Sequence, residues 1–435
     1  MSFVADLTAL VAASVDHRHC CPDGWSRVPL GSVAKIINGF PFKSGGFGDK
    51  GYPVIRIRDV TRGYTTTRFD GDAPNGFWVD AGDLIVGMDG DFQTAFWRSD
   101  RALLNQRVCK IVPDASQIDR RYLAYILPGY LALINANTPS ITVKHLSSRT
   151  LASIPLPLPP LERQQSIADR IDELFAEVDD GEAALALARD DLATWRKALL
   201  KAAVTGKLTA DWRAANQPTE TGADLLVQIL ATRDSEPKPK SKQTGKATHD
   251  EGGIESSLPV GWGRCEPNQI VEWSSGKFMP DRSMNGGVVP VYGGNGIAGY
   301  HDAALVAEPT LVIGRVGHYC GNAYTTDGAA WISDNAIYAS KVADGVAVHY
   351  LRLVFEQVNL RRLAQGGAQP FVSQNLLNSI AIPLPSRQEQ AVILEAVQSG
   401  LTEAIELEHF IDEGAAISAT LRQSILAAAF RGDLA

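Results

Sequence analysis

The sequence predicts an α+β protein in which two mostly-β domains are joined by two long helices. Three observations support this fold class. A heptad pattern without an internal proline occupies residues 161–204. Short apolar segments separated by glycine and aspartate clusters precede it, as is typical of β-rich domains. Motifs of the first half return in the same order in the second half, which indicates a pseudo-two-fold internal repeat.

The first long helix follows a proline-rich segment that begins at Pro155. Its seam of apolar or small residues alternates spacings of four and three: Ile167, Ile171, Leu174, Val178, Gly181, Leu185, Ala188, Leu192, Trp195 and Leu199. Such a seam predicts a coiled coil. At 1.5 Å per residue the helix would be a rod of roughly 60–70 Å that ends near Gly206. A rod of this kind needs a helical partner.

The partner is predicted in the same chain, because the sequence repeats itself. Gly206 and Gly432 occupy matching places 226 residues apart, whereas Gln165 and Gln390 make a further pair 225 residues apart. Adding 226 to the first seam gives a second seam: Ile393, Val397, Gly400, Ala404, Leu407, Ile411, Gly414, Ser418, Leu421 and Ile425. The two seams share one phase, so the two helices are predicted to pack against each other.

Each long helix follows a β-rich region. In the first half, the β-like segments are residues 32–37, 53–59, 83–86 and 107–112, and residues 119–133 look helical with a predicted break at Pro128. The sequence therefore divides into six segments. They are an N-terminal helix (1–20), a first domain (21–154), a first long helix (155–212), a short helix with a flexible linker (213–257), a second domain (258–381) and a second long helix (382–435).

The charge of the chain is distributed unevenly. The net charge is −8 for 435 residues. Residues 21–155 nevertheless carry sixteen Lys and Arg against twelve Asp and no Glu, a net charge of +4, whereas both helical segments are acidic. The whole-chain charge therefore does not exclude a nucleic-acid surface. Five cysteines without a C-x-x-C pair, and no apolar run of membrane-spanning length, predict a cytoplasmic protein.

The sequence contains only weak matches to motifs for cofactor binding, metal binding or catalysis. Gly294, Gly296 and Gly299 match the G-x-G-x-x-G pattern of dinucleotide-binding loops, so a nucleotide-dependent oxidoreductase is the alternative function. The residues after Gly299 are barely enough for a crossover helix, which favours a tight β-loop instead. The cluster His17, His19, Cys20 and Cys21 lacks a second set of ligands, so no metal is expected. The sequence predicts no catalysis and no cofactor in this chain.

Candidate DNA-contacting residues lie in the loops of both β-rich regions. Arg56, Arg58 and Arg62 alternate with apolar residues, which would place them on one face of a strand. Arg pairs with guanine edges, and Asn or Gln pairs with adenine edges. The other candidates are Lys43, Gln93, Thr94, Arg98, Arg101, Gln106 and Arg107 in the first half, and Lys277, Arg282, Tyr292, Asn295, His301, Arg315, His318, Tyr319, Asn322 and Gln369 in the second half.

The order of these segments resembles the specificity subunits of type I restriction–modification systems over essentially the whole chain. The matching motifs include Gly51-Tyr-Pro-Val-Ile-Arg-Ile-Arg-Asp59, Gly206-Lys-Leu-Thr-Ala-Asp-Trp-Arg213 and Val312-Ile-Gly-Arg-Val-Gly317. The resemblance implies two target-recognition domains, each for one half of a split double-stranded DNA sequence. It also implies that the two long helices pair in antiparallel fashion. A coiled-coil assembly protein with lectin-like β domains is the third hypothesis.

The resemblance also implies partners. Two methyltransferase subunits would bind S-adenosylmethionine, and motor-nuclease restriction subunits would consume ATP with Mg²⁺. Gln165, Trp195, Gln390 and Leu421 are the candidate docking residues for these subunits. The cofactors are thus expected on the partners rather than on this chain.

Overall fold

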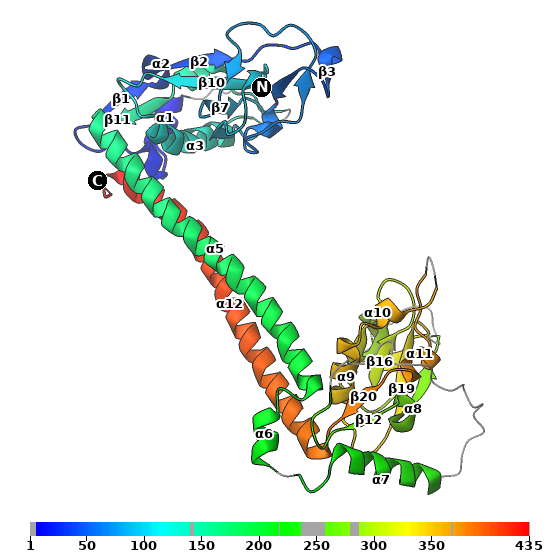
Figure 1. Cartoon of the computed structure of the whole chain (residues 1–435). Helices are drawn as coiled ribbons and strands as arrows, with labels where there is room; N and C mark the ends of the chain where they lie inside the picture. Colours follow the sequence, from blue (N-terminus) through cyan, green and yellow to red (C-terminus); the bar gives the residue numbers. More distant parts are fainter. Residues whose placement is uncertain are drawn as a thin grey trace. The chain divides into compact units, whose positions relative to one another are not determined.

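Two compact units make up the protein. The computed structural model describes residues 6–139, 143–216, 218–235, 257–278, 287–366 and 369–434. Unit 1 comprises residues 1–186 and 412–435, and unit 2 comprises residues 187–411. Two helices of 45 residues, α5 (Leu161–Thr205) and α12 (Arg387–Arg431), contribute residues to both units (Figure 1). The prediction of two long helices is confirmed.

The described residues of unit 1 form three sheets. The first pairs β1 (Ser26–Pro29) with β11 (Pro155–Leu158). The second has the order β2-β10-β7-β8, formed by Ala34–Asn38, Val108–Pro113, Leu84–Gly87 and Thr94–Phe96. The third has the order β3-β5-β4-β9-β6, formed by Phe47–Gly48, Arg68–Phe69, Tyr52–Ile55, Ala102–Leu104 and Trp78–Val79. Besides the long helices, the helices and 3₁₀ turns of unit 1 are α1 (Leu7–Ala12), η1 (His17–His19), α2 (Leu30–Val33), η2 (Ser44–Gly46), η3 (Ile57–Asp59), α3 (Arg120–Ala136) and α4 (Ser148–Ala152).

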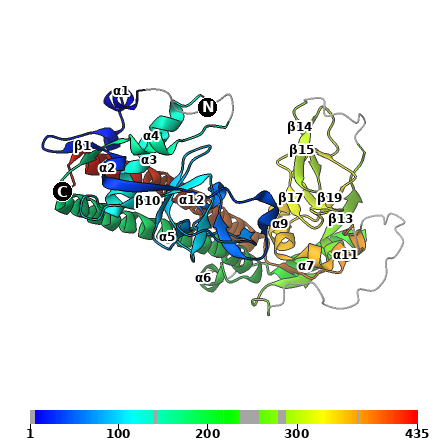
Figure 2. The ribbon, with the colours of Figure 1, turned by 90° about the horizontal axis from the view of Figure 1, so that it is seen from above.

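Unit 2 is built on the same plan. A pair joins β12 (Gly263–Cys265) to β20 (Ile382–Leu384). The four-stranded sheet has the order β13-β19-β16-β17, formed by Val271–Ser275, Ala336–Val342, Leu311–Gly314 and Ala323–Thr325. The third sheet has the order β15-β14-β18, formed by Gly296–His301, Val289–Gly293 and Trp331–Ile332. Figure 2 shows β14 beside β15. The shorter helices of unit 2 are α6 (Ala210–Ala215), α7 (Gly222–Ser235), α8 (Pro267–Ile270), α9 (Val348–Gln357), α10 (Leu360–Leu363) and α11 (Gln374–Asn378).

The two-stranded and four-stranded sheets of the two units correspond strand for strand, whereas the third sheet has five strands in unit 1 and three in unit 2. In each four-stranded sheet the first strand after the short helix pairs with the last, and the middle strand lies between the last strand and a short hairpin partner. Parallel strand pairs also occur in both units, β4 with β9 in unit 1 and β14 with β18 in unit 2. The predicted α+β class and internal repeat are confirmed.

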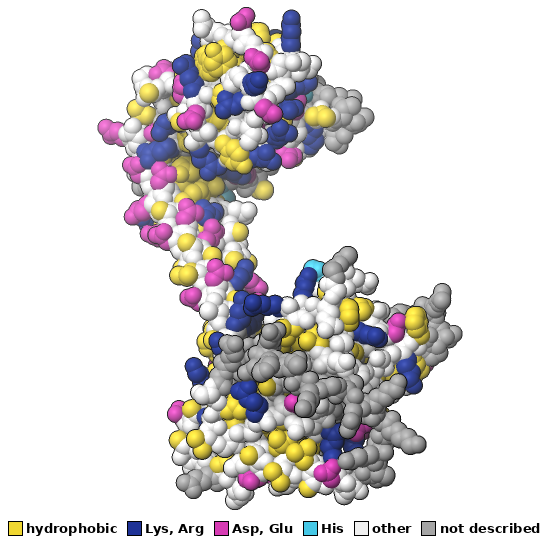
Figure 3. Space-filling model, turned by 45° about the vertical axis from the view of Figure 1, so that its right-hand side comes forward, with side chains coloured by type: hydrophobic (Ala, Val, Ile, Leu, Met, Phe, Trp, Pro, Cys, Tyr) yellow, Lys and Arg dark blue, Asp and Glu magenta, His cyan; other side chains and the backbone are white. Residues whose placement is uncertain are grey.

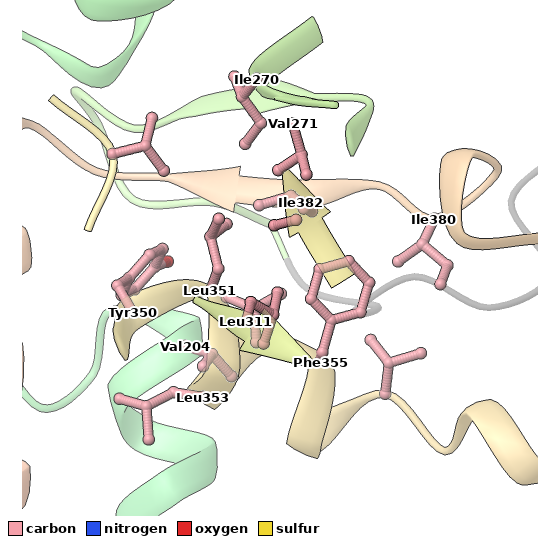
Figure 4. Close-up of a cluster of buried hydrophobic side chains, with 14 of the residues drawn as sticks. Val204, Ile270, Val271, Leu311, Tyr350, Leu351, Leu353, Phe355, Ile380 and Ile382 are labelled. Atoms are coloured by element: carbon pink, nitrogen blue, oxygen red, sulfur yellow. The ribbon is translucent and has the colours of Figure 1, made fainter. Parts of the chain in front are cut away.

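A long helix anchors each core. In unit 2, Val204 of α5 packs with Leu351 and Leu353 of α9 in the cluster drawn in Figure 4, which also contains Phe355 and Ile382. In unit 1, the corresponding cluster combines residues of α3 with Ile167 and Ile171 of α5 and with Phe430 of α12. Each buried aliphatic or aromatic side chain contributes about 1.5–3 kcal/mol, so these anchors hold the long helices firmly on the sheets.

The structure corrects the predicted break at Pro128. Helix α3 continues through this residue from Arg120 to Ala136. A proline inside a helix costs about 3 kcal/mol, because it removes one hydrogen bond and crowds the preceding turn. Ile126, Leu127 and Tyr130 around it are completely buried. Their burial outweighs the local cost, and the sequence pattern alone did not show this.

The arginine-bearing segment after β4 is not a strand, contrary to the prediction. The strand ends at Ile55, and Ile57–Asp59 form the 3₁₀ turn η3. The buried carboxylate of Asp59 accepts the backbone N–H of Arg56 at 2.9 Å, which closes the turn. The side chains of Arg56 and Arg58 therefore project from a turn at the end of a strand.

Within unit 1 the two long helices are antiparallel. Arg163, near the start of α5, donates to the carbonyl of Gly432 at 3.3 Å, just beyond the end of α12. Farther along α5, Asp179 and Glu182 accept hydrogen bonds from Arg422 at 2.5 and 3.0 Å. Rising residue numbers on α5 thus face falling numbers on α12.

Within unit 2 the pairing is antiparallel as well, and glycine makes room for it. Arg196 of α5 pairs with Glu408 of α12 at 2.7 Å. A Cβ on Gly400 would come within 2.9 Å of the Leu199 side chain. The glycines of the second seam therefore let leucines of the first seam fill the space between the helices, as small residues do at close helix contacts.

The repeat register needs one correction at the start of each long helix. The side-chain amide of Gln390 donates to two backbone carbonyls and accepts one backbone N–H. Gln164 makes the same three kinds of bond in unit 1, and both side chains are buried. Gln165 is exposed. The pairing of Gln165 with Gln390 is wrong, and Gln164 is the true counterpart, 226 residues away.

We expect Phe430→Ala to destabilise unit 1 by about 3–5 kcal/mol, because its ring is completely buried and lies 5.6 Å from that of Tyr122. Faster hydrogen–deuterium exchange in residues 120–136 would show this loss. Phe410→Ala is the control, since this ring on the same helix is 64% exposed and its loss should change stability by less than about 0.5 kcal/mol. Equal exchange in both variants would contradict the packing.

Candidate nucleic-acid interface

In unit 1, the loops that follow β2, β7 and β9 meet at one edge of the sheets. Backbone bonds join the loop after β2 to the loop after β9, with Phe40 N–H donating to Leu104 O at 2.8 Å and Gln106 N–H to Phe40 O at 3.0 Å. Met88, after β7, donates to Arg107 O at 2.9 Å. The side chains of Gln106 and Arg107 are exposed at this edge. Loops that a sheet holds in place in this way are well suited to contact a binding partner.

In unit 2, the corresponding loops make the corresponding bonds. Lys277 N–H donates to Ile332 O at 2.9 Å, and Arg315 N–H donates to Asn335 O at 2.8 Å. Gly276 lies so close to the loop after β18 that an added Cβ would fall 1.9 Å from Ser333 O. Gly39 has the same 1.9 Å relation to Asn105 O in unit 1. The same loop edge is therefore built twice.

An ion-pair cluster at the unit 1 edge holds Arg107. Its Nη1 lies 2.8 Å from Asp89 Oδ2, and His145 Nδ1 lies 2.7 Å from the other carboxylate oxygen. The Asp89 side chain is only 14% exposed, whereas that of Arg107 is 55% exposed. The cluster holds the guanidinium through its Nη1, while the arginine side chain as a whole stays largely exposed.

Other arginines of unit 1 lie against aromatic rings or turns. Arg56 lies 5.9 Å from the Phe47 ring, and Arg101 lies 4.9 Å from the Trp78 ring while it pairs with Asp80. Arg58 donates to Thr67 at 3.3 Å. Figure 3 shows Lys and Arg side chains spread over unit 1 and acidic side chains along the long helices, in agreement with the uneven charge of the sequence. The basic surface of unit 1 suits a polyanion.

A cavity of about 710 Å³ opens at the loop edge of unit 2. Its lining includes Asn295, Tyr319, Asp334, Asn335 and Gln369. Glycine and apolar residues make up most of the remaining lining, and the amides and the carboxylate offer hydrogen-bond acceptors as well as donors. The surface is thus chemically different from the arginine-rich edge of unit 1.

The structure leaves most of the predicted DNA-contacting residues at the surface but buries three of them wholly or in part. The side chains of Tyr292 and His301 lie in the interior of unit 2. Burial raises the pKa of the Tyr292 phenol, which also approaches the carbonyl of Thr325. Thr94 is half-buried in β8 and donates to Ile85 O at 2.9 Å. Arg282 lies outside the described residues.

The remaining candidates are exposed, but not all lie at the loop edges. Lys43, Arg56, Arg58, Gln93, Gln106 and Arg107 belong to the loops after the strands of unit 1, whereas Arg62, Arg98 and Arg101 lie farther along the chain from those strand ends. In unit 2, Lys277, Asn295, Arg315 and Gln369 are at the edge. His318 contacts Tyr319 and Arg361, and Asn322 donates to Tyr324.

Sequence reasoning missed four residues that the loops bring to these edges. They are Asp89, His145, Asp334 and Asn335. A signal for the last two was present, because Tyr122 and Tyr350 are 228 residues apart and the same interval relates Gln106 and Arg107 to Asp334 and Asn335. Asp89 and His145 carried no such signal, since only tertiary contacts bring them to Arg107.

The dinucleotide and metal hypotheses receive no support. Gly294 and Gly296 belong to the hairpin between β14 and β15, and β15 is a strand where a dinucleotide site needs a helix N-terminus. His17 and His19 form the short turn η1. Among the described residues, we find no group of three or more potential ligands that could hold a metal ion.

The candidate docking residues differ in exposure. Gln390 is buried and serves the fold, whereas Gln165 is exposed. Trp195 is 42% exposed and Leu421 is 45% exposed on the long helices. The structure thus leaves three of the four accessible to a partner. In the part of the chain that is described, every helix is too short or too polar to cross a membrane.

Comparisons with known proteins agree with this architecture. The family model for the type I restriction modification DNA specificity domain matches residues 22–184 and again residues 259–414. The EcoBI specificity subunit of a type I restriction enzyme from Escherichia coli is 34% identical over 100% of this chain and 91% of its own length. The EcoKI specificity subunit from Escherichia coli K12 is 22% identical over 95% of this chain and 90% of its own length.

Two solved structures share the fold. The HsdS subunit from Thermoanaerobacter tengcongensis gives a TM-score of 0.58 with 18% identity, over 95% of this chain and 98% of the other. A chain from a study of complex assembly and conformational transition of the type I R-M system gives a TM-score of 0.61 with 17% identity, over 95% of this chain and 99% of the other. The duplicated β-rich fold with paired long helices therefore recurs in solved structures.

Proposed function

Because the chain belongs to the family of type I restriction–modification DNA specificity subunits, we propose that its two sheet-rich domains recognise the two halves of an asymmetric, bipartite DNA target. The observation that carries this proposal is the loop edge that occurs once in each unit with different side chains. Two similar frames with dissimilar surfaces would bind two dissimilar half-sites. A paired scaffold between them would fix their separation, as dimer geometry does in other DNA-binding proteins.

The proposal assigns no chemistry to this chain. The partner subunits would supply the adenine methylation, with S-adenosylmethionine, and the ATP- and Mg²⁺-dependent cleavage. We also propose that the protein works in the cytoplasm, where its DNA target is.

The long helices are the proposed docking surface for two methyltransferase subunits. Besides Trp195 and Leu421, they expose Leu187, Ile405 and Phe410, each at least 60% exposed. Large apolar side chains on an otherwise acidic helix pair are typical of a site that a partner helix covers. Motor-nuclease subunits would join through this methyltransferase core.

Co-expression of the chain with its cognate methyltransferase subunit tests the proposal. Mapping of the methylated adenines should give a bipartite motif with a constant gap between its halves. Random methylation, or none, would argue against a specificity subunit. Failure of the purified complex to retain DNA would favour the assembly-protein hypothesis instead.

We expect Arg56→Ala or Arg58→Ala to weaken binding or relax one half-site and to leave the other intact, because both side chains lie at the loop edge of unit 1. A lost base contact should reduce discrimination by about 1–3 kcal/mol, and a lost phosphate contact should lower affinity uniformly. Methylation rates on duplexes with single base-pair changes distinguish the two cases. Lys35→Ala is the control, since Lys35 is exposed near the opposite end of β2. Equal loss of both half-site preferences would contradict the model of two independent recognition domains.

A further inference from the structure

We propose that Arg107 and Asn335 are corresponding base-contacting residues of the two domains, with Arg107 selecting guanine and Asn335 selecting adenine. This inference rests on the proposed DNA-binding function and deepens it. Three observations carry it: the two residues occupy the same structural position, their side chains are exposed at that position, and their surroundings differ in a way that suits two different bases.

Equivalent backbone bonds establish that Arg107 and Asn335 correspond. The carbonyl of Arg107 accepts the N–H of Met88 at 2.9 Å, and the carbonyl of Asn335 accepts the N–H of Arg315 at 2.8 Å. The chain then continues in the same way in both units. Leu146 N–H donates to Met88 O at 2.7 Å in unit 1, and Val372 N–H donates to Arg315 O at 2.8 Å in unit 2.

The neighbouring loop also corresponds, and it shows what surrounds each residue. Gly90 donates to the carbonyl of Lys144, and Gly317 donates to that of Pro370, both at 3.0 Å and both with a positive φ. These equivalent bonds show that Asp89 of unit 1 corresponds to Val316 of unit 2. The β-bridges beside them, Asp89 with His145 and Val316 with Phe371, then equate His145 with Phe371.

The ion pair prepares Arg107 for guanine. An arginine contacts guanine O6 and N7 with two parallel N–H donors. The guanidinium has five such donors, so the ion pair between its Nη1 and Asp89 is compatible with a second, bidentate contact. Because Asp89 already restricts the side chain, less conformational entropy is lost when DNA binds.

Asp89 is itself held in place. Its second oxygen lies 2.7 Å from His145 Nδ1. Next to it, the Lys144 ammonium donates to the Asn135 carbonyl at 2.7 Å, and the Asn135 amide donates to the Gly90 carbonyl. The loop that carries the arginine's partner is therefore fixed by side chains from α3 and from the segment before α4.

At the corresponding place in unit 2, the ionic partners are absent from the sequence. Val316 and Phe371 replace the carboxylate and the imidazole, and Asn335 replaces the guanidinium. An Asn side chain can accept from adenine N6 and donate to adenine N7 at the same time. Asn335 lines the 710 Å³ cavity together with Asp334 and Gln369, so an amino group of a base would meet acceptors there. This chemistry favours adenine over guanine.

Methyl transfer by the purified complex of the chain and its methyltransferase subunits tests the assignment. The substrates are duplexes with the wild-type motif and duplexes with each single base-pair change. Arg107→Ala should reduce discrimination about 5- to 150-fold at one G·C pair of one half-site. Asn335→Ala should do the same at one A·T pair of the other half-site, and Asn335→Arg should shift that preference toward G·C.

Two matched variants control for charge and fold. Lys35→Ala removes a cation of unit 1 near the far end of β2, and Asn268→Ala removes an exposed amide of α8 in unit 2. Both should keep every base preference. A misfolded variant would lose methylation on all duplexes, whereas the expected result changes one position and preserves the other half-site.

The outcomes separate this inference from the proposed function. If the wild-type complex shows no bipartite motif, the proposed function fails. If it shows the motif, but Arg107→Ala and Asn335→Ala keep every preference or slow all duplexes equally, only the present assignment fails. A uniform slowing would mark the two side chains as phosphate contacts.

Asp89 is a positioning residue in this scheme. Asp89→Ala should relax the same G·C pair as Arg107→Ala, by a smaller factor, and the double variant should be no worse than Arg107→Ala alone. Relaxation at a different base pair, or additive effects, would show that Asp89 does not act through Arg107.

Discussion

Lengthening both long helices by one heptad should lengthen the gap between the two half-sites by about three base pairs. Seven helical residues add about 10.5 Å, and a base pair adds about 3.4 Å. Duplication of residues 182–188 in α5 and 408–414 in α12 preserves the heptad phase of both seams. The half-sites themselves should not change, because no loop edge is altered.

This variant should still methylate a defined bipartite motif, but its rate of methylation should fall. DNA turns by roughly 100° over three base pairs, whereas a heptad returns a coiled-coil helix almost to the same face. The recognition domains would therefore meet the longer site with a rotational mismatch. Mapping of methylated adenines measures the gap directly.

Insertion into α5 alone is the control for the paired insertion. It would shift the leucines of α5 relative to the glycines of α12. Leu185 then could not pack against Gly414 while Leu199 packs against Gly400. The insertion would also shift cross-helix pairs on one side of it out of register, as would happen if Arg422 no longer faced Asp179 and Glu182. We expect loss of specific methylation. An unchanged gap in the paired variant would refute the idea that the helices set the spacing.

Glu389→Ala should destabilise the end of α5 in unit 2 by about 3–5 kcal/mol. The carboxylate is almost completely buried and accepts from Thr209 at 2.7 Å, from Trp262 Nε1 at 2.9 Å and from Arg213. Arg213 also donates to the carbonyl of Gly206 at 2.7 Å, so the cluster ties the helix end to α6. Removing one member of a buried ion pair leaves the other charge unpaired, and this is the main cost.

Hydrogen–deuterium exchange of residues 206–215 measures this destabilisation where it should occur. Glu389→Gln keeps an acceptor for the hydroxyl and the indole, so it should lose only about 1–3 kcal/mol. Glu395→Ala removes an exposed carboxylate from the same helix and should change stability by less than about 0.5 kcal/mol. Exchange that is as slow in Glu389→Ala as in Glu395→Ala would show that the cluster does not hold the helix end.

The repeat was predictable wherever local patterns carry it. The seams of both helices, and the glycines Gly206 and Gly432 that end them with positive φ, are visible as spacings in the sequence. The equivalent positions at the helix starts were not predictable in this way. Gln164 and Gln165 are adjacent, and only the buried hydrogen bonds identify Gln164 as the counterpart of Gln390.

The candidate site was predictable in part. Loop position and residue type pointed to Arg56, Gln106 and Arg107, which are exposed at the loop edge. The same criteria chose Tyr292 and His301, which the core of unit 2 absorbs. Residue type cannot distinguish an exposed tyrosine from a buried one within a short β-strand, because burial depends on which other strands cover it.

By itself, then, the sequence determined the α+β class, the internal repeat and the two long helices. Each depends on residues that are close together in the chain or on a constant interval between motifs. Only the tertiary structure decided that Asp89 and His145 meet Arg107 in unit 1 while Val316 and Phe371 stand beside Asn335 in unit 2. These contacts join loops that are distant in sequence, and sheet pairing, rather than any local pattern, brings them together.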